Sequence, residues 1–174
     1  RPYRIFICGF SAGGHLAASS GIRWNCPVLK KEFEGEPEGI NRPDGMILSY
    51  PVITAGEFAH KNSIRYVSGN HDYGEAEIEE WSLDKHVDAT TPPAFIWHTF
   101  EDKTVPVQNS LLLAEALTAA GVHFELHIYP VGLHGLSLAT EETANSKPEY
   151  ILPYVQGWIG RACEFIKKYP VWRD

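Results

Sequence analysis

A serine, an aspartate and a histidine each follow an apolar run of the chain, in the order Ser11, Asp102 and His134. A serine hydroxyl is a poor nucleophile unless an adjacent imidazole accepts its proton. A carboxylate on the far nitrogen of that imidazole fixes the tautomer and stabilises the imidazolium that forms. Because the three residue types complement one another in this way, they predict nucleophilic acyl transfer, with Ser11 as nucleophile, His134 as base and Asp102 as acid.

Ser11 lies in the glycine-rich segment Gly-Phe-Ser-Ala-Gly at positions 9–13, between an apolar run and a stretch of small residues. The G-x-S-x-G pattern between a strand and a helix is typical of a nucleophile elbow, a tight turn that holds the serine in a cramped backbone conformation. Side chains at positions 9 and 13 are expected to collide with neighbouring backbone, which explains Gly9 and Gly13. The Ala12 N–H, unpaired at the start of the helix, is expected to donate to an oxyanion beside Ser11.

Two other interpretations of this segment fail on the spacing of their own residues. A phosphate-binding Walker loop ends in G-K-[ST], which is absent here. The dinucleotide-binding fingerprint requires glycine at the position where Ser11 stands. An ordinary glycine-rich turn remains an alternative for the segment taken alone.

The acid and the base also have plainer interpretations. Taken alone, His134 reads as a surface-loop histidine and Asp102 as a turn aspartate, with Glu101 as a competing acid. The order Ser, Asp, His along the chain is the one used by hydrolases with a nucleophile elbow. Glycines on both sides of Leu133-His134 suit a loop that must reach back to Ser11. We therefore expect Asp102, rather than Glu101, to be the acid.

Alternating strand and helix patterns position these residues. Strands are predicted at 3–8, 45–50, 94–98 and 124–129, and helices at 12–22, 107–120 and 153–168. This alternation predicts a parallel α/β sheet, whose ligand site lies at the carboxyl ends of the strands. The stretch 24–43 reads as a solvated loop. The stretch 52–82 reads as irregular, with a short helix at 75–81, and is long enough to cover the site.

Composition excludes several classes of partner. The 174-residue chain has 44% hydrophobic and 21% charged residues, the balance of an ordinary globular domain. Its net charge of −7 and the lack of a basic patch argue against a nucleic-acid or anionic-membrane partner. No apolar run reaches the about 18 residues that a membrane span needs. The cellular compartment stays open, with the cytoplasm slightly favoured.

The remaining cysteines and histidines are expected to be structural. Three scattered cysteines argue against a disulfide framework, and Cys8 and Cys163 are expected to be small core residues. No two histidines show the spacing of a metal motif, so no metal is expected. His15 is expected to point away from the serine hydroxyl, and Trp97 and His98 to pack in the core rather than contact a ligand.

Several motifs share the chain with the three residues above: Gly9–Ala17, Ser49–Val52, Thr91–Pro93, His98–Thr99, Asp102–Pro106 and His134–Ser137. Together they resemble the α/β-hydrolase esterase/lipase family, above all its acetyl-xylan-esterase-like and feruloyl-esterase-like carbohydrate esterases. The resemblance implies a three-layer α/β-hydrolase fold with a mostly parallel central sheet, forming one catalytic domain over residues 1–174. It implies hydrolysis of small acyl esters, often acetyl groups on sugars, without a cofactor.

The resemblance also assigns the same site residues. It makes Ser11 the nucleophile, Asp102 the acid, His134 the base and the Ala12 N–H one half of the oxyanion hole. The Asp-x-x-Val-Pro spacing of the acid loop supports Asp102 over Glu101.

The chain departs from this family before the elbow, where members carry a long segment with the first strands and a second oxyanion donor. Only ten residues precede Ser11 here, so the fold is expected to be N-terminally truncated in this chain. The strand at 3–8 would then expose an unpaired edge, which is an aggregation hazard. We expect a missing N-terminal segment, or another chain, to complete the sheet.

The sequence thus predicts a serine carboxylesterase acting on small or sugar-linked acyl esters. One alternative is a serine peptidase of the prolyl-oligopeptidase type, which shares this catalytic domain. Ala12 argues against it, because such peptidases resemble G-x-S-Y-G-G at this point. The other alternative is an inactive, truncated hydrolase-like interaction module.

Overall fold

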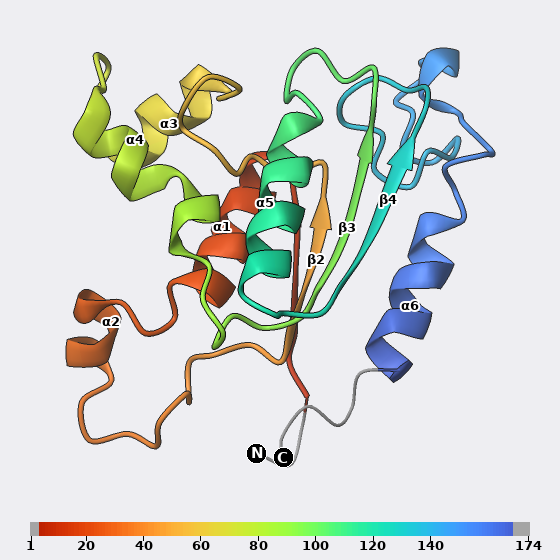
Figure 1. The fold of residues 1–174 in the computed structure, drawn as a ribbon. Helices are drawn as coiled ribbons and strands as arrows, with labels where there is room; N and C mark the ends of the chain where they lie inside the picture. Colours follow the sequence, from red (N-terminus) through yellow and green to blue (C-terminus); the bar gives the residue numbers. More distant parts are fainter. Residues whose placement is uncertain (1–3, 169–174) are drawn as a thin grey trace.

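Four parallel strands in the order β1-β2-β3-β4 form the central sheet in the part of the chain that the structure describes. The structure is a computed structural model, and it describes residues 4–168. The strands are β1 (Phe6–Phe10), β2 (Gly45–Ser49), β3 (Ala94–Thr99) and β4 (Phe124–Tyr129). Because all four run the same way, their carboxyl ends meet at one edge of the sheet, at the top of Figure 1. The prediction of a parallel α/β sheet is confirmed.

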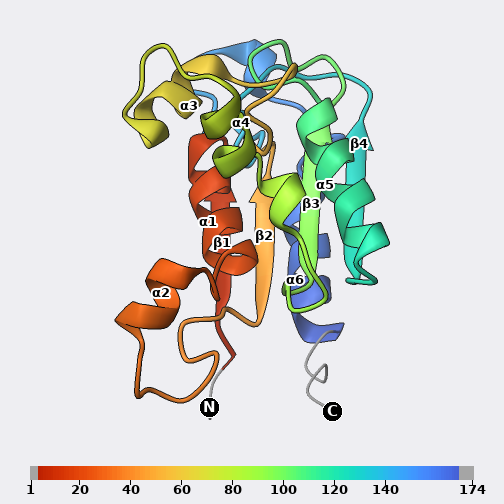
Figure 2. The same cartoon turned by 60° about the vertical axis from the view of Figure 1, so that its left-hand side comes forward.

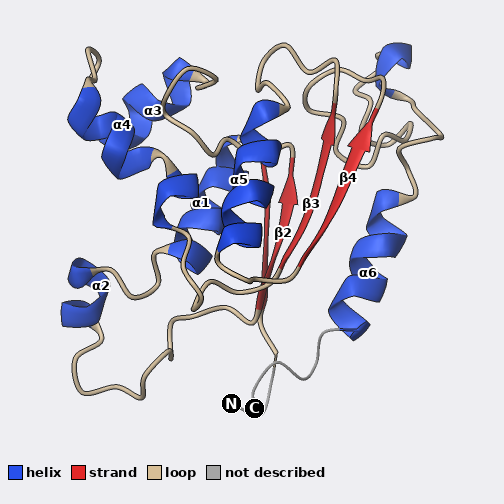
Figure 3. Ribbon diagram, in the orientation of Figure 1, coloured by secondary structure: helices blue, strands red, loops and turns tan. Residues whose placement is uncertain are grey.

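Helices cover both faces of this sheet, which gives three layers (Figures 1 and 2). Helices α1 (Ala12–Ile22) and α5 (Gln108–Ala119) pack on one face, and α6 (Trp158–Lys168) packs on the other. The shorter helices α2 (Pro27–Glu32), α3 (Lys61–Ser68) and α4 (Glu75–Trp81) lie at the periphery (Figure 3). The part of the chain that the structure describes also contains the 3₁₀ turns η1 (Leu83–His86) and η2 (Pro148–Tyr150).

The apolar residues of the middle strands alternate between two cores. Met46, Leu48 and Ile96 pack beneath α1 and α5, together with Leu113 and Leu117 of α5. On the other face, Ile47, Phe95 and Trp97 pack against α6, whose buried side chains are Trp158, Ala162 and Phe165. Every residue of β2 and β3 is buried, as expected for the central strands of a parallel sheet.

Several predicted boundaries are wrong for identifiable reasons. The first strand begins at Phe6 and continues to Phe10, while Tyr3, included in the predicted strand, lies outside the described residues. The expected loop at 24–43 contains α2, which begins with Pro27 at its first turn, a position where proline costs no hydrogen bond. The stretch 52–82 contains α3 besides the expected α4. The last helix begins at Trp158, because Val155 joins the core from a turn rather than from a helix.

The prediction that Cys8 and Cys163 are core residues is also wrong. Both are exposed in the described structure, and Cys26 is half-buried. The rings of Phe6 and Phe10, two residues before and after Cys8, contact α6 side chains on the same face of β1, but Cys8 between them stays uncovered. All three cysteines are free thiols.

Strand β1 lies at the edge of the sheet. Within residues 4–168 it pairs with β2 and with no other strand, so its second edge carries no ladder of hydrogen bonds. Ile5, directly before this strand, is 52% exposed.

Within residues 4–168, no helix combines the length and the apolar character needed to cross a lipid bilayer.

Candidate active site

Ser11 occupies the turn between β1 and α1 with φ 56° and ψ −120°, a conformation that residues other than glycine rarely adopt. Two hydrogen bonds hold it there, one to the last residue of β2 and one to the segment after this strand. The Ser11 N–H donates to the Ser49 carbonyl at 3.0 Å, and the Ser11 carbonyl accepts from the Val52 N–H at 3.1 Å. The strained turn predicted from the sequence is therefore present, and β2 holds it in place.

The glycines around Ser11 only partly match the prediction. A Cβ on Gly9 would lie 2.1 Å from the Gly13 carbonyl oxygen, so this glycine is required for close approach of β1 and α1. At Gly13, by contrast, a Cβ would meet nothing within 4 Å in the described structure, so the expected collision is absent. The second close approach occurs at Gly14, where a Cβ would lie 2.9 Å from the Pro51 Cα.

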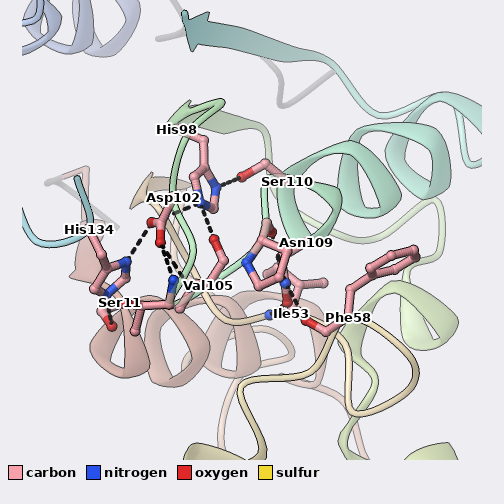
Figure 4. Close-up of polar contacts among 11 residues, drawn as sticks. Ser11, Ile53, Phe58, His98, Asp102, Val105, Asn109, Ser110 and His134 are labelled. Atoms are coloured by element: carbon pink, nitrogen blue, oxygen red, sulfur yellow. Dashed lines mark hydrogen bonds and ion pairs between the residues drawn. The ribbon is translucent and has the colours of Figure 1, made fainter. Parts of the chain in front are cut away.

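The three residues singled out in the sequence lie side by side (Figure 4). The Ser11 Oγ is 2.7 Å from His134 Nε2, and His134 Nδ1 is 2.5 Å from Asp102 Oδ2. Asp102 follows β3 and His134 follows β4, so adjacent parallel strands bring them to the edge at which β1 delivers Ser11. Glu101 turns elsewhere, and its Oε2 accepts a hydrogen bond from the Gly132 N–H at 3.3 Å.

Asp102 is fully enclosed, and its side chain is 0% exposed. Its Oδ1 accepts hydrogen bonds from the Thr104 and Val105 N–H groups, both at 2.9 Å. Burial by itself raises the pKa of Asp102, but hydrogen bonds from His134, His98 and the Val105 N–H outweigh burial and hold the pKa well below its usual range. The carboxyl group is therefore ionised and faces His134 as a hydrogen-bond acceptor.

His98 and Tyr50 are two neighbours of the site that the sequence analysis did not assign to it. The His98 ring is buried, as expected, but it also lies 3.3 Å from Asp102 Oδ2. The Tyr50 ring meets the His134 ring edge to face, with centroids 5.0 Å apart, and its hydroxyl accepts a hydrogen bond from the Ser137 N–H at 3.0 Å. Burial, assisted by the charge of Asp102, raises the pKa of Tyr50 to about 12, so its phenol stays neutral. Both residues could have been found from the sequence, because each is a polar or amphipathic residue at the end of an apolar strand.

Ala12 begins helix α1 directly after Ser11. Within residues 4–168 its N–H donates to no backbone or side-chain acceptor, as expected for the first residue of a helix. His15, one turn later, lies 3.2 Å from the Val52 carbonyl through Nδ1 and forms no hydrogen bond with Ser11. The expectation that His15 points away from the serine hydroxyl agrees with this contact.

A cavity of about 700 Å³ adjoins the His134 ring. Its lining comes from the acid loop after β3, the histidine loop after β4, and η2. The residues are Phe100, Glu101, Asp102, Lys103 and Thr104 of the acid loop, Leu133 and His134 of the histidine loop, and Tyr150 of η2. Phe100 is 68% exposed and Leu133 is 45% exposed, so the cavity presents apolar surface beside the imidazole. In the described residues, no three His, Cys, Asp or Glu side chains are grouped so that they could hold a metal ion.

Comparison with solved structures defines the class of protein. An alpha/beta hydrolase enzyme from a deep-sea metagenome library matches with a TM-score of 0.68 and 29% identity, over 97% of this chain and 55% of that chain. An acetyl ester-xyloside bifunctional hydrolase from Caldicellulosiruptor lactoaceticus matches with a TM-score of 0.72 and 36% identity, over 92% of this chain and 55% of that chain. The three-layer fold with its parallel sheet is therefore an α/β-hydrolase fold.

The family follows from the sequence comparison. The family described as BD-FAE matches residues 1–117, and the chain belongs to this family. The acetylxylan esterase of Xylanibacter ruminicola is 37% identical over 143 residues, covering 80% of this chain and 27% of that protein. The endo-1,4-beta-xylanase B of Butyrivibrio fibrisolvens is 40% identical over 157 residues, covering 90% of this chain and 22% of that protein. The chain thus spans about a quarter of the length of these curated relatives.

Proposed function

We propose that this site hydrolyses carboxylic esters of small acyl groups through an acyl-enzyme on Ser11. The observation that carries the proposal is the hydrogen-bonded path from the Ser11 Oγ through His134 to Asp102, at 2.7 and 2.5 Å. A serine in a strained turn, a base within hydrogen-bond reach and a carboxylate that orients the base are the parts an activated nucleophile requires. No cofactor takes part in this chemistry.

In the proposed reaction, the Ser11 oxygen attacks the ester carbonyl while its proton passes to His134 Nε2. The Ala12 N–H donates to the oxyanion of the tetrahedral intermediate. The imidazolium, stabilised by Asp102, then protonates the departing alcohol and leaves the acyl group on Ser11. Water attacks the acyl-enzyme with His134 again accepting the proton, the acid is released, and the Ser11 hydroxyl is restored.

We propose an acetylated sugar as the substrate class. Because His134 protonates the leaving alcohol, that alcohol must lie beside the imidazole, where the cavity of about 700 Å³ is located. The exposed Phe100 ring offers a flat apolar surface to one face of a sugar ring, and Glu101 and Lys103 offer polar groups to its hydroxyls. The relatives named as acetylxylan esterase and acetyl ester-xyloside hydrolase support this choice.

An activity-based probe tests the proposed chemistry. We expect a fluorophosphonate to add once to the protein and not to the Ser11→Ala variant, as measured by intact mass. Nitrophenyl acetate and acetylated xylan should both release acetate, whereas a prolyl amide should not be cleaved. Adduct formation with cleavage of the amide alone would favour the peptidase alternative. No adduct and no acetate release from folded protein would refute the esterase proposal.

We also propose that the free edge of β1 pairs with a strand from a preceding segment or from another chain. The exposed edge supports this, and so does the short span of the chain relative to its relatives. Such a segment is also the expected source of a second oxyanion donor, since the loss of one donor costs about 10²- to 10³-fold in rate. If the 19.5 kDa chain alone is monomeric and unfolds cooperatively, the proposal is wrong.

A further inference from the structure

His98 is a buried polar residue in a strand whose other buried side chains are mostly apolar. It is the fifth residue of β3 and stands four positions before Asp102. The side chains of His98 and Asp102 are both 0% exposed. Burying an imidazole here is costly unless its ring nitrogens find partners, and both of them do. Figure 4 shows the ring between Asp102 and Ser110.

The partners of His98 fix the position of one proton. Its Nε2 lies 2.9 Å from the Val105 carbonyl oxygen and 3.3 Å from Asp102 Oδ2. A carbonyl and a carboxylate oxygen only accept hydrogen bonds, so Nε2 must carry a hydrogen. Its Nδ1 lies 2.8 Å from the Ser110 Oγ, a hydroxyl that can donate to the ring. A hydrogen on Nε2 therefore fits these contacts when it is directed at the Val105 carbonyl and shared with Asp102 Oδ2.

Four N–H groups therefore face the Asp102 carboxylate: three hydrogen-bond to it, and the fourth, the His98 Nε2–H, is shared with the Val105 carbonyl. Oδ1 accepts from the Thr104 and Val105 backbone at 2.9 Å each. Oδ2 lies 2.5 Å from His134 Nδ1 and 3.3 Å from His98 Nε2. A carboxylate offers about four lone-pair sites, so this set fills its capacity and leaves its plane no freedom to rotate.

We propose that His98 is a positioning residue, which holds Oδ2 of Asp102 toward His134 and shares the negative charge of that oxygen. This inference rests on the proposed function, because His98 acts on the reaction only through Asp102 and His134. Without the His98 N–H, Oδ2 keeps the His134 Nδ1–H as its one partner, and rotation of the carboxylate plane about the donors on Oδ1 is less restricted. Oδ2 then also holds more charge and stabilises the His134 imidazolium more strongly, so the base gives up its proton only at higher pH.

Two amide substitutions separate the two sides of the His98 ring. In His98→Gln the side-chain amide reaches the position of Nε2 and keeps a donor for Asp102. In His98→Asn the amide reaches the position of Nδ1 and keeps a partner for Ser110, but it cannot reach Asp102. Both variants carry the same amide group. If His98 had only a structural role, the activity of each variant would follow its thermal stability.

We expect His98→Asn to lower kcat by about 10- to 100-fold with KM changed by less than about twofold, the size of effect that orienting partners of reactive groups produce. The acid limb of its kcat/KM profile, which reports the base, should move to higher pH. His98→Gln should retain kcat within about fivefold of the unsubstituted protein, with an unshifted acid limb. Equal kcat values and unshifted acid limbs in two folded variants would overturn the proposal.

A proton NMR measurement keeps this test independent of turnover. The His134 Nδ1–H bonded to Asp102 should give a far-downfield resonance in the unsubstituted protein and in His98→Gln, and a weakened or shifted one in His98→Asn. An unchanged resonance in His98→Asn would refute the positioning role even if no ester is hydrolysed. Conversely, a resonance that responds as expected in a protein forming no fluorophosphonate adduct would refute the proposed function and leave the positioning role standing.

Discussion

Asn109 links the loop after β2 to the loop that carries Asp102, and its truncation is expected to loosen both. The side chain is fully buried at the start of α5. Its Oδ1 accepts hydrogen bonds from the Ile53 and Thr54 N–H groups at 2.8 and 3.1 Å. Its Nδ2 donates to the Phe58 carbonyl at 2.9 Å (Figure 4) and to the Pro106 carbonyl at 3.0 Å. All four hydrogen-bonding positions of the amide are therefore used.

The cost of Asn109→Ala follows from the groups left behind. The Pro106 carbonyl keeps a partner, because it also accepts the Asn109 backbone N–H at 3.0 Å. The substitution removes the Asn109 amide as the partner of three other groups, the Ile53 N–H, the Thr54 N–H and the Phe58 carbonyl. The hydrogen bonds of the Ile53 and Thr54 N–H groups are buried, whereas that of the Phe58 carbonyl is half-buried. Each unsatisfied buried group costs about 1–3 kcal/mol, so the lower limit for the two buried groups is about 2 kcal/mol. For a chain of this size, that corresponds to a fall in Tm of about 4–8 °C.

Urea unfolding of Asn109→Ala measures this loss, with Gln108→Ala as the matched control. Gln108 is the neighbouring helix residue, and no side-chain hydrogen bond is present for it in the described structure. Its truncation should change the free energy of unfolding by less than about 0.5 kcal/mol. If Asn109→Ala costs less than about 1 kcal/mol, or no more than Gln108→Ala, the reasoning from unsatisfied groups is refuted.

Three further predictions concern pH, packing and the histidine loop. Burial lowers the pKa of His15 in the folded state, so its contribution to stability is complete above the ordinary value of about 6.5 and is lost as pH falls toward the folded-state pKa. The urea midpoint should therefore fall between pH 7 and 5, and less steeply in His15→Asn; equal slopes would contradict this. Gly9→Ala should cost at least about 3 kcal/mol because its Cβ meets backbone, whereas Gly13→Ala, in open space, should be neutral or stabilising by thermal unfolding. Tyr50→Phe removes the acceptor of the Ser137 N–H and should lower the free energy of unfolding in urea by about 1 kcal/mol; no measurable loss would contradict this.

The part of the site that could be predicted from the sequence depends on local backbone geometry. A glycine before Ser11 and small residues after it are what a strand–turn–helix elbow requires, so the motif specifies its own conformation. The carboxyl ends of parallel strands meet at one edge, so residues just beyond those ends were expected to converge. Asp102 and His134 were predicted from that rule. In the structure, His134 lies within hydrogen-bond distance of Ser11 and Asp102 lies within hydrogen-bond distance of His134.

The contacts that the sequence could not predict depend on residues distant in the chain. Asn109 looks like an ordinary helix residue until the loop containing Ile53 folds over it. The exposure of Cys8 depends on which neighbouring elements cover β1, and the apolar character of the strand carries no information about that cover. The requirement for glycine at position 14 rather than 13 likewise depends on where Pro51 crosses the helix. Each of these is set by tertiary packing.

The two halves of the proposed chemistry have different structural support within residues 4–168. For the proposed activation of Ser11, the hydrogen bonds that hold Ser11, His134 and Asp102 all lie within the described residues. Oxyanion stabilisation is supported by the Ala12 N–H at the start of α1. Oxyanion donors assist both fluorophosphonate addition and ester turnover, and under the proposal above the absence of one donor lowers each rate by about 10²- to 10³-fold. The phosphonate adduct is stable and accumulates even when it forms slowly, whereas turnover needs repeated cycles. We therefore expect this chain by itself to accumulate the adduct but to hydrolyse esters slowly, and turnover should rise on addition of a segment that pairs with β1.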